Sequence, residues 1–279
     1  MSDLEHKVEA KVAFIGVGNM ARAIFSGMIA SGYPANKIIG TSRTPEKREY
    51  YHGQYGIEML SDNGLAVQQA DAIVLCVKPA QMKVVIEEFA PYVRDDQLFI
   101  SVAAGVELGA ISHWLGQPVA VVRSMPNTPS QLGAGMTGLI ANSTTHASQK
   151  EWVDQLFASV GSSVWVEDEA HMHTVTSLSG SAPAYFFRFI EAMIKEATEQ
   201  GLDEATSRKL ASHAMLGAAR MVIELDDPIE QLRGNITSPN GTTERALVSF
   251  EASDVDKVVS DAMIACIDRS KEMSKDFSV

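Results

Sequence analysis

The sequence predicts an α/β protein in which a doubly wound, mostly parallel sheet is followed by an all-helical C-terminal part. Three observations lead to this fold class. Short apolar runs alternate with amphipathic segments as far as about residue 167. A glycine-rich turn directly follows the first apolar run, as in Rossmann-like domains. From residue 168 onward the patterns are helical only. We therefore expect a dinucleotide-binding domain over 1–167 and an all-helical substrate-binding and oligomerisation domain over 168–279.

The expected strands are short and apolar, which is typical of a sheet covered on both faces. They lie at residues 11–15, 37–41, 56–59, 71–77, 97–103, 118–123, 138–141 and 163–166. The helices between them are expected at residues 20–31, 45–55, 65–70, 81–93, 108–115 and 147–159. In the C-terminal part, helical patterns cover residues 183–200, 204–225, 228–234, 242–250 and 253–275.

The turn after the first strand has the pattern Gly-x-Gly-x-x-Ala. Gly16 would permit the tight turn, Gly18 would let a pyrophosphate approach the backbone, and Ala21 would let the helix pack close to the sheet. Unpaired N–H groups at the start of that helix would then face the phosphates. Because a strand precedes the pattern and a helix follows it, we interpret it as a dinucleotide site and not as an ordinary glycine-rich turn.

The end of the second strand indicates which dinucleotide binds. Sites for NAD usually place an acidic residue about 20 positions beyond the glycines, where it accepts the ribose hydroxyls. Here the strand ends in Thr41, Ser42 and Arg43, with no acid. A hydroxyl and a guanidinium would hold a 2′-phosphate, which a carboxylate would repel. The sequence thus favours NADP(H), read by Ser42 and Arg43, and leaves NAD(H) possible.

Composition excludes several function classes. The net charge of −12 and the pI of about 5.0 argue against binding along a nucleic-acid backbone. We expect no membrane span, because no apolar run has the length that one requires. The polar start of the chain, residues 1–7, does not resemble a signal peptide. Cys76 and Cys266 are expected to be free thiols in a reducing, cytoplasmic compartment, and no Cys/His spacing indicates a metal site.

The C-terminal helices carry broad apolar faces that a small helical domain would not bury alone. Residues 211–223 and 258–267 are rich in alanine, methionine and aliphatic side chains. Obligate interfaces resemble a core cut in half, so these faces predict a homo-oligomer. The alternative is that they simply cover the first domain.

Several motifs resemble those of the pyrroline-5-carboxylate reductase family, and the resemblance covers nearly the whole chain. Its most specific stretch is the segment 232–251, which contains Ile-Thr-Ser-Pro-Asn-Gly-Thr-Thr at 236–243. One departure is visible, because Asn240-Gly241 stands where the family usually has two glycines. Asparagine is the next best residue at a left-handed position, so we expect the turn to be kept. The remaining motifs are at residues 14–21, 77–79, 103–105, 125–129 and 178–185.

The resemblance implies further cofactor residues. Asn63 would lie near the adenosine ribose, and the 125–129 motif would form a wall of the nicotinamide pocket. The residues so assigned, besides the glycines and the 42–43 pair, are Asn19, Met20, Ala21, Asn63, Val77, Lys78, Pro79, Ala103, Ala104 and Asn127.

The resemblance also implies the reaction, in which a hydride from nicotinamide C4 reduces the C=N bond of 1-pyrroline-5-carboxylate to L-proline, the last step of proline biosynthesis. The loop would hold the substrate carboxylate, with Thr243 as the catalytic residue. The substrate-binding residues so implied are Asn235, Ser238, Asn240, Gly241, Thr242 and Thr243. The hydroxyl of Thr243 would lie near the ring nitrogen. No acidic residue, histidine or lysine occurs over 235–243, so we expect the substrate to arrive protonated or to take its proton from water. A homodimer, possibly assembled into a homodecamer, is also implied.

Three other functions remain open at this point. A β-hydroxyacid dehydrogenase would need a catalytic lysine on a helix of the second domain, and Lys195 lacks the surrounding motif. A non-catalytic NADP(H) sensor would not need the loop at 238–243. A reductase of six-membered cyclic imines is harder to exclude, because one methylene is worth only about 1–3 kcal/mol in a pocket.

Overall fold

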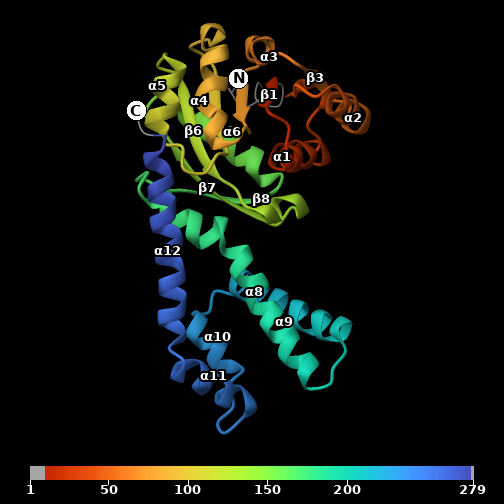
Figure 1. The fold of residues 1–279 in the computed structure, drawn as a ribbon, viewed down its shortest axis with the longest axis vertical. Helices are drawn as coiled ribbons and strands as arrows, with labels where there is room; N and C mark the ends of the chain where they lie inside the picture. The colour runs from red at the N-terminus through yellow and green to blue at the C-terminus, as the bar shows by residue number, and fades with distance from the viewer. Residues whose placement is uncertain (1–9, 278–279) are drawn as a thin grey trace. The chain divides into compact units, whose positions relative to one another are not determined.

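The computed structural model describes residues 10–277, so the expectation about residues 1–7 lies outside the described residues. The chain forms two compact units (Figure 1). The first contains the residues up to Ser181 together with those from Cys266 onward, and the second is Ala182–Ala265. The end of the chain thus belongs to the same unit as its beginning. The expected functional boundary between residues 167 and 168 stays a prediction.

The first unit is built on an eight-stranded sheet with the order β3-β2-β1-β4-β5-β6-β7-β8. Strands β1 to β6 are parallel to one another, β7 is antiparallel to β6, and β8 is parallel to β7. This confirms the doubly wound, mostly parallel sheet. The strands are β1 (Val12–Ile15), β2 (Ile38–Thr41), β3 (Glu58–Leu60), β4 (Ala72–Leu75), β5 (Leu98–Ser101), β6 (Ala120–Met125), β7 (Gly135–Ala141) and β8 (Gly161–Trp165).

Helices cover both faces of this sheet. They are α1 (Asn19–Ala30), α2 (Pro45–Tyr55), α3 (Asn63–Gln69), α4 (Pro79–Phe89), α5 (Leu108–Leu115), α6 (Ala147–Ala158) and α7 (His171–Val175). Side chains alternate along β1, so Ala13 and Ile15 join the core under α3, α4 and α5, while Val12 and Phe14 join the core under α1, α2 and α6. Both faces of the sheet are therefore shielded from water, which explains why the strands are continuously apolar.

Some boundaries differ from the expected ones for local reasons. Helix α3 begins at Asn63 because the Asp62 side chain accepts a hydrogen bond from the Leu65 backbone N–H at 3.1 Å. Helix α4 begins at Pro79, a residue well suited to a first helical turn, and ends at Phe89 before a short 3₁₀ turn. A π-helical segment, Thr176–Gly180, follows α7 and was not expected.

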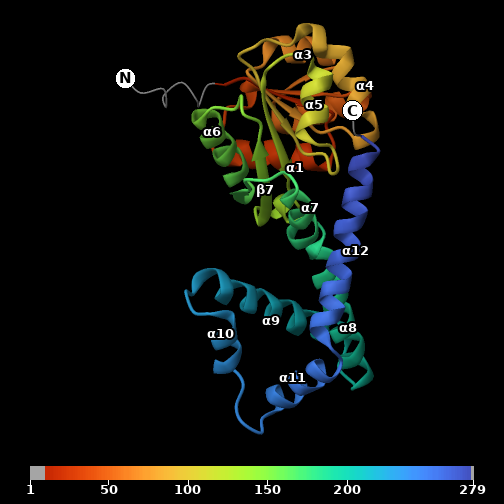
Figure 2. The ribbon, with the colours of Figure 1, turned by 90° about the vertical axis from the view of Figure 1, so that its left-hand side faces the viewer.

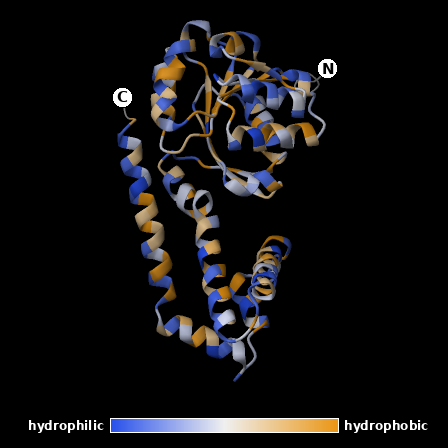
Figure 3. Ribbon diagram, turned by 45° about the vertical axis from the view of Figure 1, so that its right-hand side comes forward, coloured by the Kyte–Doolittle hydropathy of each residue, from blue (hydrophilic) through white to orange (hydrophobic). Residues whose placement is uncertain are grey.

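The second unit is all helical, as expected. Its helices are α8 (Ala182–Glu199), α9 (Glu204–Glu224), α10 (Ile229–Asn235), α11 (Thr242–Ala252) and the first part of α12 (Val255–Lys275). Gly201, at a φ of 96°, lies in the turn after α8, and the Asp203 side chain caps α9. Figure 3 shows hydrophobic residues recurring along these helices.

The last turns of α12 belong to the first unit. Phe277 packs against the core under α5, and the last turns of α12 lie near that helix (Figures 1 and 2). The backbone of Gly105 approaches the same turns so closely that an added Cβ would lie 3.2 Å from the Met273 Cβ. Both ends of the chain thus contribute to one compact unit.

Candidate cofactor and substrate sites

The glycine turn between β1 and α1 has the conformation that its sequence predicts. Gly16 has a φ of 85°, and a Cβ there would lie 2.7 Å from the Val77 Cγ1, so the fold itself requires glycine. Gly18 is different, because it has ordinary dihedral angles and no atom lies within 4 Å of an added Cβ. The open space beside Gly18, at the start of a 12-residue helix, is where the sequence places a pyrophosphate.

Thr41 holds the glycine turn to the end of β2. Its hydroxyl accepts a hydrogen bond from the Gly16 N–H at 3.0 Å, and its carbonyl accepts one from the Val17 N–H at 3.0 Å. The side chain is 2% exposed. Sequence reasoning did not assign this role, although a hydroxyl residue directly before the 42–43 pair was a usable signal.

A cleft of about 470 Å³ opens at the carboxyl ends of β1, β2 and β4. Seven of the predicted cofactor residues line it, namely Gly16, Gly18, Ser42, Arg43, Asn63, Val77 and Lys78. Sequence reasoning missed several lining residues, most of them on α4: Ser61, Ala80, Gln81, Val84 and Val85. Lys47 and Cys76 also line the cleft. Burial raises the pKa of the Cys76 thiol.

The loop after β2 is held by its own hydrogen bonds. The Arg48 guanidinium donates to the Ser42 carbonyl at 2.8 Å, and the Thr44 N–H donates to the Ser42 hydroxyl at 3.2 Å. Arg43 Nη2 lies 3.1 Å from Oε1 and 3.4 Å from Oε2 of Glu88, a residue of α4. The guanidinium that the sequence assigns to a 2′-phosphate is therefore paired with a carboxylate.

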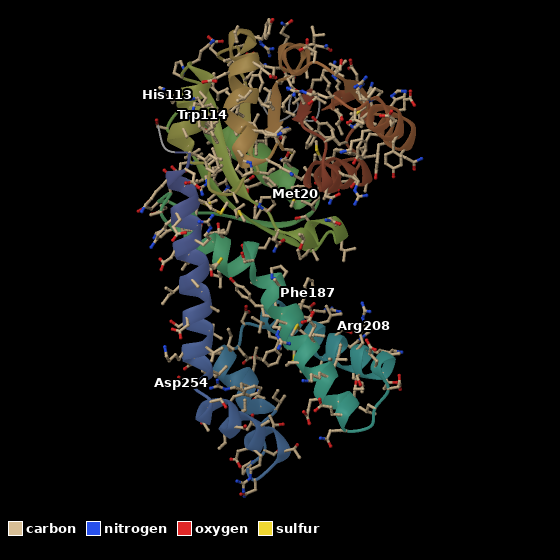
Figure 4. The ribbon with its side chains drawn as sticks, viewed as in Figure 1. Met20, His113, Trp114, Phe187, Arg208 and Asp254 are labelled. Carbon is tan, nitrogen blue, oxygen red and sulfur yellow. The ribbon has the colours of Figure 1, made fainter. Side chains whose placement is uncertain are left out.

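The other predicted cofactor residues do not line this cleft. Asn19 begins α1 and Met20 follows it (Figure 4), whereas Ala21 is a buried residue of the same helix. Pro79 begins α4, and Ala103 and Ala104 follow β5. Asn127 is 8% exposed. Its Nδ2 donates to the Ser179 carbonyl at 3.1 Å, and its Oδ1 accepts from the Met136 N–H at 2.9 Å. Both ends of this amide are thus engaged within the fold, and its cofactor contact stays a prediction.

The loop between α10 and α11 forms the expected left-handed turn. Asn240 has a φ of 58°, which confirms the expectation that asparagine adopts the left-handed conformation and keeps the turn. The next residue, Gly241, caps α11 and donates its N–H to the Ser238 carbonyl at 2.9 Å. A Cβ on Gly241 would lie 2.8 Å from that carbonyl oxygen, so glycine is required there.

Glu244 is a further loop contact that sequence reasoning missed. Its Oε2 accepts a hydrogen bond from the Asn240 N–H at 2.8 Å. A carboxylate thus already binds a backbone N–H of the predicted carboxylate site. Of the other predicted substrate residues, Asn235 ends α10, Ser238 and Thr242 are exposed, and Thr243 is half-buried in the first turn of α11.

Residues 10–277 show neither a metal-binding cluster nor a membrane-spanning helix. No group of three or more histidine, cysteine or acidic side chains in this range is placed to hold a metal ion. Within the same range, no helix is both long enough and apolar enough to cross a membrane.

Comparison with known proteins places the chain among enzymes. Residues 169–273 match the family model described as pyrroline-5-carboxylate reductase dimerisation, and residues 11–105 match the model described as NADP oxidoreductase, coenzyme F420-dependent. The chain is 42% identical over 265 residues to pyrroline-5-carboxylate reductase from Pseudomonas aeruginosa, covering 95% of this chain and 97% of that protein. The chain belongs to the pyrroline-5-carboxylate reductase family. The Escherichia coli reductase is 36% identical, over 96% of this chain and all of its own length.

Solved structures of the family have the same fold. The reductase from Coxiella burnetii superimposes with a TM-score of 0.91 at 40% identity, covering 95% of this chain and 99% of that one. The reductase from Plasmodium falciparum, solved with NADP bound, gives a TM-score of 0.85 at 28% identity, over 95% and 98% of the two chains. The expected family, fold class and use of a nicotinamide cofactor are thereby confirmed.

Proposed function

We propose that this chain reduces the C=N bond of 1-pyrroline-5-carboxylate to L-proline, as the last step of proline biosynthesis, and that NADPH is its preferred hydride donor. The observation that carries the reaction is the similarity to pyrroline-5-carboxylate reductases over nearly the full length of both proteins. The shape of the predicted substrate loop supports it, because Asn240 adopts the left-handed conformation expected for the turn.

The residues of the cleft fit a dinucleotide. The space beside Gly18 can take a pyrophosphate against the N-terminus of α1, and the cleft extends from there to Asn63 and Arg43. When bound, the nicotinamide supplies the hydride, and the protein supplies position and electrostatics. Lys78, at the carboxyl end of β4, is an exposed cation on the same cleft.

The preference for NADPH rests on the loop after β2. Ser42 and Arg43 line the cleft and can donate to a 2′-phosphate, while no acidic residue lies at the end of the strand. NADH binds more weakly than NADPH, through the glycine turn, which recognises the part that both dinucleotides share.

The loop at 235–243 is the proposed substrate site. Backbone N–H groups at the start of α11 would bind the substrate carboxylate, and the Thr243 hydroxyl would orient the ring nitrogen. Glu244 is the first acidic residue after the loop in the sequence, and its carboxylate is an acceptor for the Asn240 N–H. The proton on the ring nitrogen therefore comes with the substrate or from water. Positioning two reactants together can itself contribute on the order of 7–11 kcal/mol.

The helical unit is the proposed site of self-association. Large apolar side chains on its helices are exposed, including Phe186 and Phe187 on α8, Leu216 and Ile223 on α9, and Val258 on α12. The matching dimerisation family model supports a homodimer, and assembly of dimers into a decamer is the finer proposal. We place the enzyme in the cytoplasm, where NADPH is available.

Loss of absorbance at 340 nm tests the reaction and the cofactor together. Purified protein is mixed with NADPH or NADH, with and without DL-1-pyrroline-5-carboxylate. We expect loss of NADPH that depends on the substrate and is faster than loss of NADH. A faster reaction with NADH would refute the preference for the 2′-phosphate but keep the reaction. Binding of NADPH without turnover would refute the substrate and point to another imine or to a sensor.

A further inference from the structure

The Arg43–Glu88 pair lies at the edge of the cofactor cleft. Arg43 lines the cleft and comes from the loop after β2, whereas Glu88 comes from the last turn of α4. Both carboxylate oxygens are within 3.4 Å of Arg43 Nη2. The two side chains are 78% and 46% exposed, so the pair forms in water and can open.

The position of Glu88 on α4 explains why its carboxylate reaches Arg43 beside the cleft. Val84 lines the cleft, and Glu88 follows it by four residues, so both side chains lie on the same face of the helix. The preceding acid, Glu87, belongs to a different face of α4. Its carboxylate pairs with Lys83 of the same helix at 3.9 Å.

A carboxylate and a 2′-phosphate compete for the same guanidinium. The phosphate carries about two negative charges, and both anions seek the planar donors of an arginine. Glu88 occupies Nη2 of Arg43, so a 2′-phosphate must either displace the carboxylate from that nitrogen or bind the remaining guanidinium donors with the carboxylate close to a dianion. A ligand without the 2′-phosphate does not need Arg43. Its binding therefore requires neither displacement of Glu88 nor the approach of a dianion to the Glu88 carboxylate.

We propose that Glu88 is a specificity-determining residue whose carboxylate competes with the 2′-phosphate for Arg43. Glu88 thereby lowers the ratio of the affinity for NADPH to the affinity for NADH, so that NADH can still serve as a hydride donor. The proposal rests on the cofactor site proposed above, in which Arg43 reads the 2′-phosphate. It adds a residue of α4, more than 40 positions away in sequence, to the determinants of that preference.

Fragments of the two cofactors test this without any turnover. Isothermal titration calorimetry would measure the Kd of adenosine 2′,5′-bisphosphate and of 5′-AMP for the full chain and its variants. Glu88→Gln should tighten binding of the bisphosphate about two- to fivefold, the range expected for an exposed charge pair, and change the Kd of 5′-AMP less than about twofold. Glu87→Gln is the matched control, because it removes the same charge from the neighbouring position and should change neither Kd.

Arg43→Ala separates competition from simple repulsion. This variant should lose most of the preference for the bisphosphate over 5′-AMP, and adding Glu88→Gln to it should then produce a smaller gain than in the wild-type background. If Glu88→Gln tightened binding of the bisphosphate as much in the Arg43→Ala background as in wild type, competition for Arg43 would be overturned. Equal tightening by the Glu87→Gln control would also overturn it.

The Kd values of the two single variants distinguish a wrong role for Glu88 from a wrong cofactor assignment for Arg43. If Arg43→Ala weakens the bisphosphate but Glu88→Gln leaves it unchanged or weakens it, Glu88 does not compete and the proposed reading of the 2′-phosphate stands. If Arg43→Ala leaves the ratio of the two Kd values unchanged, the assignment of Arg43 fails and the inference fails with it.

Discussion

The imidazole Nδ1 of His173 lies 2.9 Å from the hydroxyl oxygen of Ser270, which is 97 positions away in the sequence. The two residues are 7% and 4% exposed. Burial lowers the pKa of His173, and the positive charge of Arg123 lowers it further. Arg123 is itself buried and pairs with Glu169 at 3.0 Å. Both effects favour the neutral imidazole in the contact between α7 and the last turns of α12.

This contact predicts a loss of stability in mild acid. A folded-state pKa below the ordinary value of 6.5 means that the unfolded chain takes up the proton first as the pH falls. The contribution of His173 to stability is present above about pH 6.5 and is lost as the pH falls toward the lowered folded pKa. Each kcal/mol lost would lower Tm by about 2–4 °C.

Thermal unfolding measured between about pH 8 and pH 5 checks this for wild type and for His173→Gln. The variant should show a flatter dependence of Tm on pH. His113, which is exposed on α5 (Figure 4), offers the control variant His113→Gln, which should follow wild type. A His173→Gln profile parallel to that of wild type would remove His173 as the cause.

The two glycines of the first turn should respond differently to alanine. Gly18→Ala meets no atom, so Tm should stay within about 2 °C of wild type, while the added methyl group should weaken NADPH binding at least about tenfold. Gly16→Ala must adopt a φ of 85° against Val77 and should lose at least about 1–2 kcal/mol of stability. Fluorescence titration of NADPH and thermal unfolding would separate the effects. Unchanged NADPH affinity in a stable Gly18→Ala protein would contradict the placement of the pyrophosphate.

Removal of the Thr243 hydroxyl should slow the reaction without stopping it. If Thr243 only orients the ring nitrogen, Thr243→Ala should lower kcat about tenfold, the worth of one hydrogen bond. Thr243→Ser keeps the hydroxyl and should recover most of that loss. Steady-state kinetics with 1-pyrroline-5-carboxylate would measure both. Complete loss of turnover with substrate binding intact would indicate that the hydroxyl supplies the proton.

A charge on the exposed face of α8 should prevent self-association. Phe187 is 61% exposed and is labelled on α8 in Figure 4. Burial of an unpaired carboxylate in an apolar interface is costly, so Phe187→Asp should shift the protein to monomers. Light scattering coupled to gel filtration would measure the mass, with Lys195→Asp, an exposed change on the same helix, as control. A Phe187→Asp protein as large as wild type would place the interface elsewhere.

The features that sequence analysis predicted correctly depend on neighbouring residues. The turn at Gly16 and the left-handed conformation at Asn240 follow from the residue types and their immediate flanks. The apolar runs likewise identified the strands, because a sheet covered on both faces admits little else.

The features that it missed depend on residues far apart in the chain. No local sequence pattern links Arg43 with Glu88, and the folded sheet brings these two residues together. The same is true of His173 and Ser270, which meet because the end of α12 returns to the first unit. The hydrogen bonds of Asn127 to residues on two other segments are of the same kind. Local patterns contain no information on such pairings, so the detailed environment of a site residue cannot be derived from them.

The most direct test of the proposed reaction is its stoichiometry, measured as the L-proline formed for each NADPH consumed. Wild-type protein is incubated with limiting NADPH and an excess of DL-1-pyrroline-5-carboxylate, and L-proline is measured by chiral chromatography against the NADPH consumed. We expect one L-proline for each NADPH consumed, with no D-proline. Consumption of NADPH without formation of proline, or formation of both enantiomers, would contradict it.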